Sequence, residues 1–134
     1  MIKAARISLS DRKIMVVDDD YDIVHVVRRH LEKWGFSVDT FTNPLHAFEM
    51  FKDSPDRYSV ALLDIRMPEI NGVVLAEMML KVKPAMQIII MTAFELYAAD
   101  LKASLPTIKS GDVLIKPLKV DQVCNAVKKH LQTE

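Results

Sequence analysis

Hydrophobic residues occur along this chain in two patterns that alternate with one another. Short unbroken apolar runs, such as Val60–Leu63, are typical of strands that are buried on both faces of a parallel sheet. Between these runs, apolar residues recur three and four positions apart, which predicts amphipathic helices. Five runs alternate with five helical segments. We therefore predict an α/β fold in which a doubly wound, five-stranded parallel sheet carries helices on both faces.

The predicted strands can be placed from the limits of the apolar runs. They are Lys13–Val17, Phe36–Phe41, Tyr58–Leu63, Gln87–Met91 and Val113–Ile115. A doubly wound sheet of five strands commonly has the flavodoxin-like order 2-1-3-4-5, which makes the first and third strands neighbours. We expect that order here.

The predicted helices are defined by apolar stripes and by capping residues. The stripes are Ile23, Val27, Leu31 and Trp34; Leu45, Phe48 and Phe51; Val74, Leu75, Met78, Met79 and Val82; and Val120, Val123, Cys124, Val127 and Leu131. Asp20 can cap the first helix and Asn43 the second, whereas Asn71–Gly72 is typical of a turn. The segment from Glu95 to Ala103 has the weakest helical pattern and stops before Pro106.

Composition limits the classes of protein to which this chain can belong. Its 134 residues are enough for one domain with a substantial core, and half of them are hydrophobic. Lys and Arg together number 18, as do Asp and Glu, so the formal net charge is zero. A neutral chain has no global field for nucleic acid or an anionic membrane, and we expect neither as a direct partner.

Cysteine content and hydropathy bear on where the protein works. The single cysteine, Cys124, excludes an internal disulfide framework, suits a reducing compartment and falls on an apolar stripe, where we expect it to be buried. The chain has no apolar run of about 18 residues, and residues 1–12 lack the apolar core of a signal peptide. We expect a cytoplasmic protein with an N-terminal extension, residues 1–12, followed by one domain, residues 13–134.

Polar side chains stand where four of the predicted strands end. Asp18 and Asp19 follow the first strand, Asp64 the third, Thr92 the fourth and Lys116 the fifth. Because the carboxyl ends of parallel strands meet at one edge of a sheet, the three carboxylates should lie close together. Clustered carboxylates repel one another unless a cation joins them, and oxygen ligands without Cys or a His cluster favour Mg²⁺.

Mg²⁺ beside a lysine and a hydroxyl suits a phosphoryl group. The ion and the ammonium neutralise phosphoryl oxygens, while the hydroxyl donates a hydrogen bond. The chain has three glycines and no Gly-rich phosphate loop, so we do not expect it to hold a nucleotide here. An Asp in such a place can itself be the nucleophile and carry the phosphoryl group as an acyl phosphate.

Four pieces of sequence, each at the end of an apolar strand, together resemble a known family. They are Val16–Asp20, Leu63–Pro68 followed by Asn71–Gly72, Met91–Ala93 and Ile115–Pro117. Each piece is weak alone. In this order, and over the stretch from Lys13 to Leu131, the chain resembles the response-regulator receiver domain of two-component signalling.

The resemblance assigns the chemistry to particular residues. It implies that Asp64 is the phosphoacceptor, that Thr92 hydrogen-bonds the phosphoryl group and that Lys116 pairs with it. Ala93 would leave room for the group, and the Lys116–Pro117 bond would be cis. The chain would then be a phosphorylation-controlled switch, which catalyses its own phosphoryl transfer but is not a metabolic enzyme.

The same resemblance implies a Mg²⁺ site. Asp19 and Asp64 would bind the ion directly, together with the backbone carbonyl of Arg66, and Asp18 would act mainly through water. The side chains of Arg66 and Phe94 occupy positions that tune the lifetime of the phosphoryl group in the family, although both also suit an ordinary surface.

Partners and output follow from the resemblance as well. A sensor histidine kinase or a phosphotransfer protein would donate the phosphoryl group to a stand-alone receiver, and a downstream protein would be the target. Since no DNA-binding domain follows residue 134, we expect output by protein–protein contact or by phosphorelay.

The switch region departs from the family pattern. The family usually has Tyr or Phe three residues before the lysine and often Phe after the Lys–Pro pair, where this chain has Val113 and Leu118. Valine is stiff at χ1 and has no ring to turn between surface and pocket. We therefore expect the surface around the fourth helix to respond by a backbone shift and not by an aromatic rotamer.

Two alternative functions stay open at this point. One is a phosphorylation-independent adaptor on a receiver scaffold, which the missing aromatic at Val113 favours and the complete acid cluster opposes. The other is an Mg²⁺-dependent phosphatase with an Asp nucleophile. That chemistry often adds a second acid two residues later, where this chain has Arg66.

Overall fold

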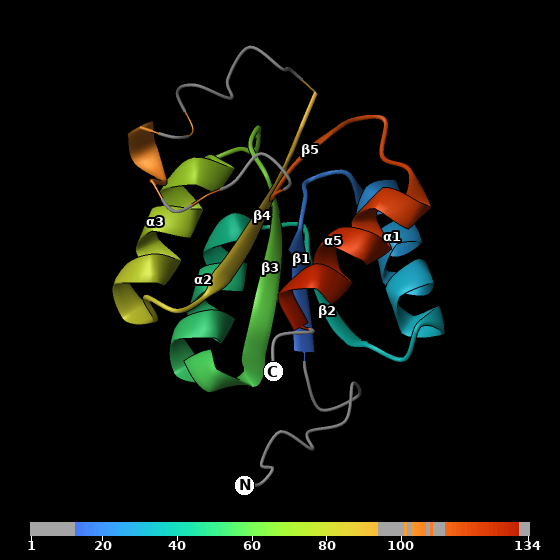
Figure 1. Cartoon of the computed structure of the whole chain (residues 1–134). Helices are drawn as coiled ribbons and strands as arrows, with labels where there is room; N and C mark the ends of the chain where they lie inside the picture. The colour runs from blue at the N-terminus through green and yellow to red at the C-terminus, as the bar shows by residue number, and fades with distance from the viewer. Residues whose placement is uncertain (1–12, 94–100, 102, 107, 109–111, 132–134) are drawn as a thin grey trace, which may run out of the picture.

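The fold is a five-stranded parallel sheet between two layers of helices (Figure 1). In this computed structural model the described residues are 13–93, 101, 103–106, 108 and 112–131. The strands are β1 (Lys13–Val17), β2 (Ser37–Phe41), β3 (Tyr58–Asp64), β4 (Gln87–Thr92) and β5 (Val113–Ile115). Their order is β2-β1-β3-β4-β5 and every pairing is parallel, which confirms the predicted fold class and strand order.

Helices cover both faces of the sheet, as predicted. They are α1 (Tyr21–Lys33), α2 (Pro44–Asp53), α3 (Gly72–Val82) and α5 (Val120–Leu131), with a short 3₁₀ helix at Pro55–Arg57. Figure 1 shows α1 and α5 on one face of the sheet and α2 and α3 on the other. Most of the predicted helical segment Glu95–Ala103 lies outside the described residues.

Asp and Asn side chains begin three of the helices. Asp20 Oδ1 accepts a hydrogen bond from the amide of Asp22 at 2.9 Å, which confirms Asp20 as the cap of α1. Asn43 Oδ1 accepts from the amides of Leu45 and His46 at the start of α2. Each cap satisfies amide donors that have no partner within the helix, and so fixes where the helix starts.

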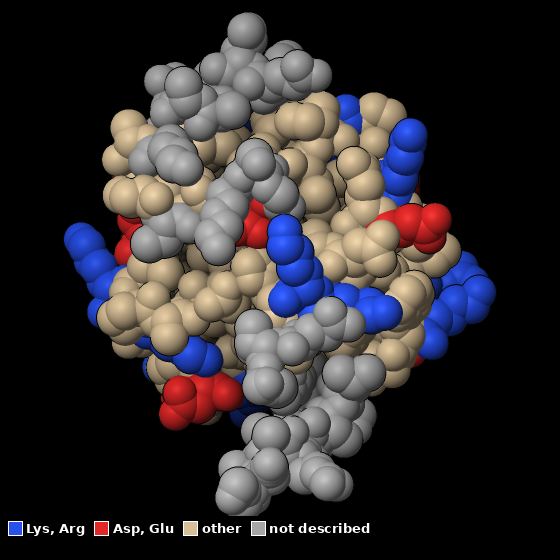
Figure 2. Space-filling view, in the orientation of Figure 1, with Lys and Arg blue, Asp and Glu red and all other residues tan. Residues whose placement is uncertain are grey.

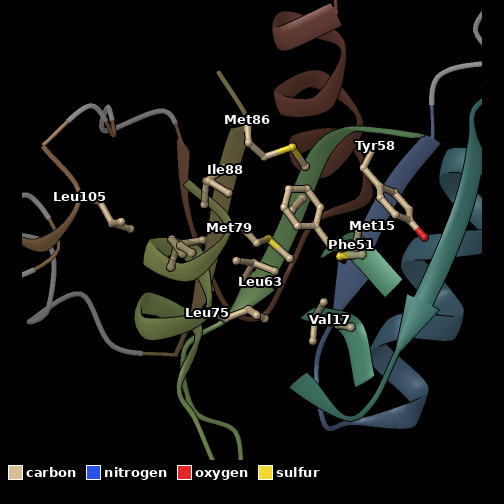
Figure 3. Packing of buried hydrophobic residues seen from close by; sticks show 14 of the residues in the cluster. Met15, Val17, Phe51, Tyr58, Leu63, Leu75, Met79, Met86, Ile88 and Leu105 are labelled. Atoms are coloured by element: carbon tan, nitrogen blue, oxygen red, sulfur yellow. The ribbon is translucent and has the colours of Figure 1, made fainter. Parts of the chain in front are cut away.

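Two apolar clusters, one on each face, hold the layers together. The cluster under α2 and α3 contains Phe51, Tyr58, Leu63, Leu75 and Met79, whose side chains interdigitate across the sheet (Figure 3). The cluster under α1 and α5 includes Cys124, which is fully buried, as expected. No helix among the described residues combines the length and apolarity that crossing a bilayer requires.

The assignment of some residues to the apolar stripes of the helices is wrong. Leu45, Val74 and Val82 are 42%, 38% and 40% exposed, whereas the alanines at 47 and 76 are fully buried. Large apolar residues dominate a periodicity argument, but small residues let a helix approach the sheet closely. Trp34 follows the last residue of α1 and is 43% exposed, with Lys128 Nζ 4.2 Å from the centre of its ring.

Charged side chains of both signs share the surface. On the face shown in Figure 2, Lys and Arg groups lie over α1 and α5, and acidic groups are interspersed among apolar and uncharged ones. The carboxyl ends of the strands, where Asp18, Asp19 and Asp64 stand, lie at the upper edge of the sheet in Figure 1.

Candidate functional site

The carboxyl edge of the sheet brings charged residues from three strands into contact. Lys116 Nζ donates to Asp18 Oδ2 at 2.8 Å and lies 2.9 Å from Asp64 Oδ1. Carboxylate oxygens of Asp18, Asp19 and Asp64 all lie within 4.8 Å of one another. The prediction that the three carboxylates lie close together is therefore confirmed, and Lys116 joins two of them.

The backbone after β1 separates its two aspartates. The amide of Asp18 donates to the carbonyl of Phe41 at 3.1 Å, which continues the pairing of β1 with β2. Asp18 Oδ1 accepts from the amide of Asp20 at 2.9 Å, so this side chain is held inward and has no exposed surface. Asp19 is exposed. Asp18 is thus committed to contacts within the protein, whereas Asp19 faces solvent at the mouth of the site.

Burial dominates the electrostatics of the site. Desolvation raises the pKa of Asp18 and of Asp64, although hydrogen bonds from Lys116 oppose this. Burial also acts to lower the pKa of Lys116, but its bonds to the two carboxylates hold that pKa above its ordinary value. With the three carboxylates ionised, these four side chains carry a charge of −3 + 1 = −2.

This donor set fits a divalent cation. The clustered side chains offer carboxylate oxygens and no nitrogen or sulfur, which suits a hard ion such as Mg²⁺, and a net charge of −2 matches the charge of the ion. Asp64 is 4% exposed and Asp18 is fully buried, so a cation here would offset charges that water does not reach. The cluster therefore has both the chemistry and the charge for Mg²⁺.

Thr92 is the last residue of β4, and Ala93 follows it. Thr92 is 3% exposed, pairs with Ile115 across the ladder, and accepts a hydrogen bond on its carbonyl from the amide of Lys116 at 2.7 Å. Ala93 is exposed. The structure thus places the predicted hydroxyl residue and the predicted small residue next to the strand that carries the lysine. Phe94 lies outside the described residues.

Arg66 lies in the loop that follows β3. It is exposed, and with Asp19 it lines a pocket of about 630 Å³ whose other walls include Met67, Pro68 and Val73. The amide of Ile65 donates to the carbonyl of Met91 at 3.1 Å and ties the first residue of this loop to β4. The loop therefore starts from a fixed point beside Asp64.

Gly72 is a residue of this site whose role the sequence did not reveal. A Cβ atom on Gly72 would collide with the backbone carbonyl of Asp64. Its amide donates to the carbonyl of Ile65 at 2.9 Å, while the side chain of Asn71 caps α3. The pair predicted as a turn is thus a helix start pressed against the end of β3. The Asn-Gly signal was correct in place, but it could not show the close approach.

The two residues that depart from the family pattern, Val113 and Leu118, both pack against the apolar core. Val113, the first residue of β5, is partly buried against the cluster under α2 and α3, and Leu118 packs against the cluster under α1 and α5. The Lys116–Pro117 bond is cis, as the resemblance implied.

Comparison with known proteins places the chain in a family. The model of the response regulator receiver domain matches residues 14–128. The response regulator receiver protein CpdR of Brucella abortus is 31% identical over 120 residues, which cover 90% of this chain and 97% of CpdR. The transcriptional regulatory protein ZraR of Klebsiella oxytoca is 32% identical over 112 residues, 82% of this chain but 24% of ZraR.

Solved structures show the same relationship. A response regulator receiver domain protein from Clostridium thermocellum superposes with a TM-score of 0.80 at 25% identity, covering 90% of this chain and 94% of that one. The response regulator protein TrrA of Thermotoga maritima, solved in complex with Mg²⁺-BeF, has a TM-score of 0.77 at 29% identity, with 89% and 98% covered. The family model, the relatives and the shared fold agree that this chain belongs to the response-regulator receiver domains of two-component systems, which are signalling domains.

Proposed function

We propose that the chain is a phosphorylation-controlled switch in which Asp64 accepts a phosphoryl group from a phosphohistidine on a sensor kinase or phosphotransfer protein. The observation that carries this proposal is the contact of Lys116 with both Asp18 and Asp64 inside a cluster of charge −2. Such a cluster holds a nucleophilic carboxylate, a cation site and a fixed ammonium within a few ångströms of one another.

Each residue of the site has a part in the transfer. An oxygen of Asp64 forms a bond to phosphorus while the phosphorus–nitrogen bond of the donor breaks. Lys116 pairs with a phosphoryl oxygen, and the hydroxyl of Thr92 donates to another. Asp19, Asp64 and the carbonyl of Arg66 would hold Mg²⁺, and Asp18 would act through water. When bound, Mg²⁺ neutralises charge on the transferring group.

The catalytic contribution of the protein is positioning. The carboxylate and the ammonium are already 2.9 Å apart, and burial of Asp64 keeps competing water from it. Groups that are placed before the reaction need no reorganisation during it, and that is where most of the rate advantage of such sites arises. The proposal of a divalent ion at this site is supported by TrrA, a relative of the same fold that was solved in complex with Mg²⁺-BeF.

A second candidate is an adaptor that binds its partner without phosphorylation. It is favoured by Val113, because a valine cannot turn a ring toward the site when the phosphoryl group arrives. An Mg²⁺-dependent phosphatase is disfavoured, since the position of its usual second acid is held by the exposed Arg66.

Phosphoryl labelling tests the proposal. The protein is incubated with Mg²⁺ and acetyl phosphate, and intact and peptide mass spectra are searched for one base-labile phosphoryl group on Asp64. Asp64→Asn should abolish the adduct. Asp39→Asn is the matched control, since Asp39 lies in β2 of the same sheet but belongs to a polar network at the other edge, and labelling should persist.

Three outcomes are distinguishable. An adduct on Asp64 that needs Mg²⁺ supports the switch. No adduct, together with no change in NMR spectra on addition of Mg²⁺ and BeF₃⁻, would favour the adaptor, because the fluoride complex does not hydrolyse as an acyl phosphate does. Rapid release of phosphate from many phosphoesters would favour the phosphatase.

A further inference from the structure

Strand β5 is flanked by a polar side-chain contact at each of its ends. It is an outer strand of the sheet and pairs with β4 through Val113, Leu114 and Ile115. Just beyond its carboxyl end, Lys116 contacts Asp18 and Asp64. Just before its amino end, Asp112 Oδ1 lies 2.7 Å from Nε2 of His130, in the last turn of α5.

The distal contact is unusually well shielded for a pair at a helix end. The side chain of His130 is 15% exposed and that of Asp112 is 9% exposed. Both line a hollow of about 270 Å³ whose apolar walls include Met86, Leu105 and Ile108. Hydrogen bonds in such surroundings are stronger than in water, and their geometry is more sharply defined. The pair therefore fixes the start of β5 relative to the end of α5.

We propose that Asp112 and His130 are positioning residues for the phosphoryl site. They act through β5 on Lys116, so that occupation of the site changes the Asp112–His130 contact, and breaking that contact changes the affinity of the site for a phosphoryl group. This inference rests on the proposed function, since it concerns the regulation of the same site.

Two contacts join the site to β5. Lys116 Nζ contacts an oxygen of Asp64, so its position should depend on which oxygen atoms are present there. The amide of Lys116 donates to the carbonyl of Thr92 at 2.7 Å. Both Thr92 and Lys116 are residues that the proposed function brings to the phosphoryl group. A displacement of either one is thus passed to the end of β5 through a side-chain contact and a backbone hydrogen bond.

The strand itself passes a displacement on without absorbing it. The three residues of β5 are extended, with a rise of about 3.3 Å per residue, and have little freedom to shorten, so the strand joins Asp112 to Lys116 by a short and stiff path. At Val113 the chain has no aromatic ring whose rotation could take up the movement, and a valine side chain is stiff. What remains adjustable is the distal contact with His130.

A structural role for the pair alone makes a different prediction. A contact that only fastened α5 would lower stability when broken and leave binding at Asp64 unchanged. Coupling between two sites is reciprocal in binding free energy, so a positioning pair must show itself in both directions. The two directions can be measured separately.

The first experiment observes the backbone amide signals and the imidazole signals of the labelled full chain by NMR, before and after Mg²⁺ and BeF₃⁻. The signals of His130 should shift when BeF₃⁻ binds. His30, in the last turn of α1, is the matched control and should not respond. If Thr92 and Lys116 respond but His130 does not, the inference is overturned while the proposed function stands. If no residue of the site responds, the proposed function itself fails.

The second experiment measures the BeF₃⁻ concentration at half-saturation, with Mg²⁺ saturating. His130→Ala should shift it by about threefold or more, and His30→Ala should leave it unchanged. Asp112→Asn combined with His130→Ala should have no more effect than either change alone, because both break the same contact. Equal midpoints for wild type and His130→Ala would contradict the inference. Should that variant not fold, the NMR result on the unaltered chain decides.

Discussion

The two edges of the sheet carry polar networks built from similar kinds of residue, but only one of these networks has balanced charges. At the amino edge, Lys13 Nζ donates to Ser37 Oγ at 3.1 Å and to Asp39 Oδ1 at 3.2 Å. The hydroxyl of Tyr58 donates to Asp39 Oδ2 at 2.7 Å, and Figure 3 shows that hydroxyl pointing out of the apolar cluster. One ammonium thus meets one carboxylate, and both carboxylate oxygens have donors.

At the carboxyl edge the same strands end in an excess of negative charge. Lys116 is shared between Asp18 and Asp64, and with Asp19 nearby the four side chains carry −2. The networks also respond oppositely to burial. Desolvation, followed by the contact with Asp39, raises the pKa of Tyr58 to about 12, which keeps this donor protonated. At the other edge, burial raises the pKa of carboxyls that the proposed site needs ionised.

The comparison separates a structural network from a binding site. A neutral, fully bonded network gains nothing from a ligand, and its natural role is to fix the register of β1, β2 and β3. A network with charge −2 lacks a counter-charge, which one divalent cation would supply. We therefore expect mutations at the amino edge to change the free energy of unfolding by the same amount with or without Mg²⁺. The effect of mutations at the carboxyl edge should depend on Mg²⁺.

The largest contrast is expected when each lysine is replaced. Lys116→Met leaves buried carboxylates without their counter-charge and should lower the free energy of unfolding by about 3 kcal/mol without Mg²⁺. Saturating Mg²⁺ should recover much of this loss. Lys13→Met removes a partly exposed ion pair and should cost about 0.5–1 kcal/mol, with or without Mg²⁺. Urea unfolding of both variants measures this, and equal, Mg²⁺-independent losses would remove the distinction between the edges.

A smaller effect, but of opposite sign at the two edges, is expected when each aspartate is made neutral. Asp64→Asn should raise the free energy of unfolding at neutral pH, without Mg²⁺, by about 1 kcal/mol, because burial disfavours the charged form. Asp39→Asn should lower it by about 1–2 kcal/mol, since Lys13 and Tyr58 donate to different oxygens of Asp39 and one of these becomes an NH₂ donor in asparagine.

The pH dependence of the Asp64→Asn effect follows from its direction of shift. A carboxyl whose pKa is higher in the folded chain favours folding below its ordinary value of 3.8 and loses that contribution as pH rises through the folded value. The advantage of Asp64→Asn should therefore be largest at neutral pH and shrink on acidification. Unfolding curves at several pH values check it, and an advantage that grew toward acid would contradict the assignment.

Most of the proposed site could be predicted from the sequence, because it lies where apolar runs stop. The end of a buried strand is visible in one dimension, and parallel pairing brings such ends to one edge. For this reason the sequence alone predicts that Asp18, Asp64 and Lys116 lie close together. Thr92 and Asp19 followed from the same rule.

The rest could not be predicted, because periodicity reports only apolar burial. Asp39 and Ser37 alternate with apolar residues and have the pattern of a solvent-facing strand side, yet Asp39 is bonded to two residues far along the chain. His130 and Asp112 are 18 positions apart, and nothing in either position marks the other. Close approach is equally invisible, as Gly72 and the buried alanines of α2 and α3 show.

The smallest effect, and the most direct test of the charge difference between the edges, is stabilisation by Mg²⁺ itself. Binding to the folded chain alone adds RT ln(1 + [Mg²⁺]/Kd), about 0.4 kcal/mol when the free ion equals Kd and more above it. The temperature of thermal unfolding should therefore rise with Mg²⁺, and Asp19→Asn should weaken this shift by removing the exposed carboxylate of the cluster.

Asp22→Asn is the matched control. It removes one charge at the same end of α1, outside the cluster, so a general electrostatic effect would weaken the shift in both variants. A shift lost in Asp19→Asn but kept in Asp22→Asn assigns the ion to the cluster. A shift kept in both would mean that Mg²⁺ acts elsewhere on the chain, and the imbalance at the carboxyl edge would then need another cation to complete it.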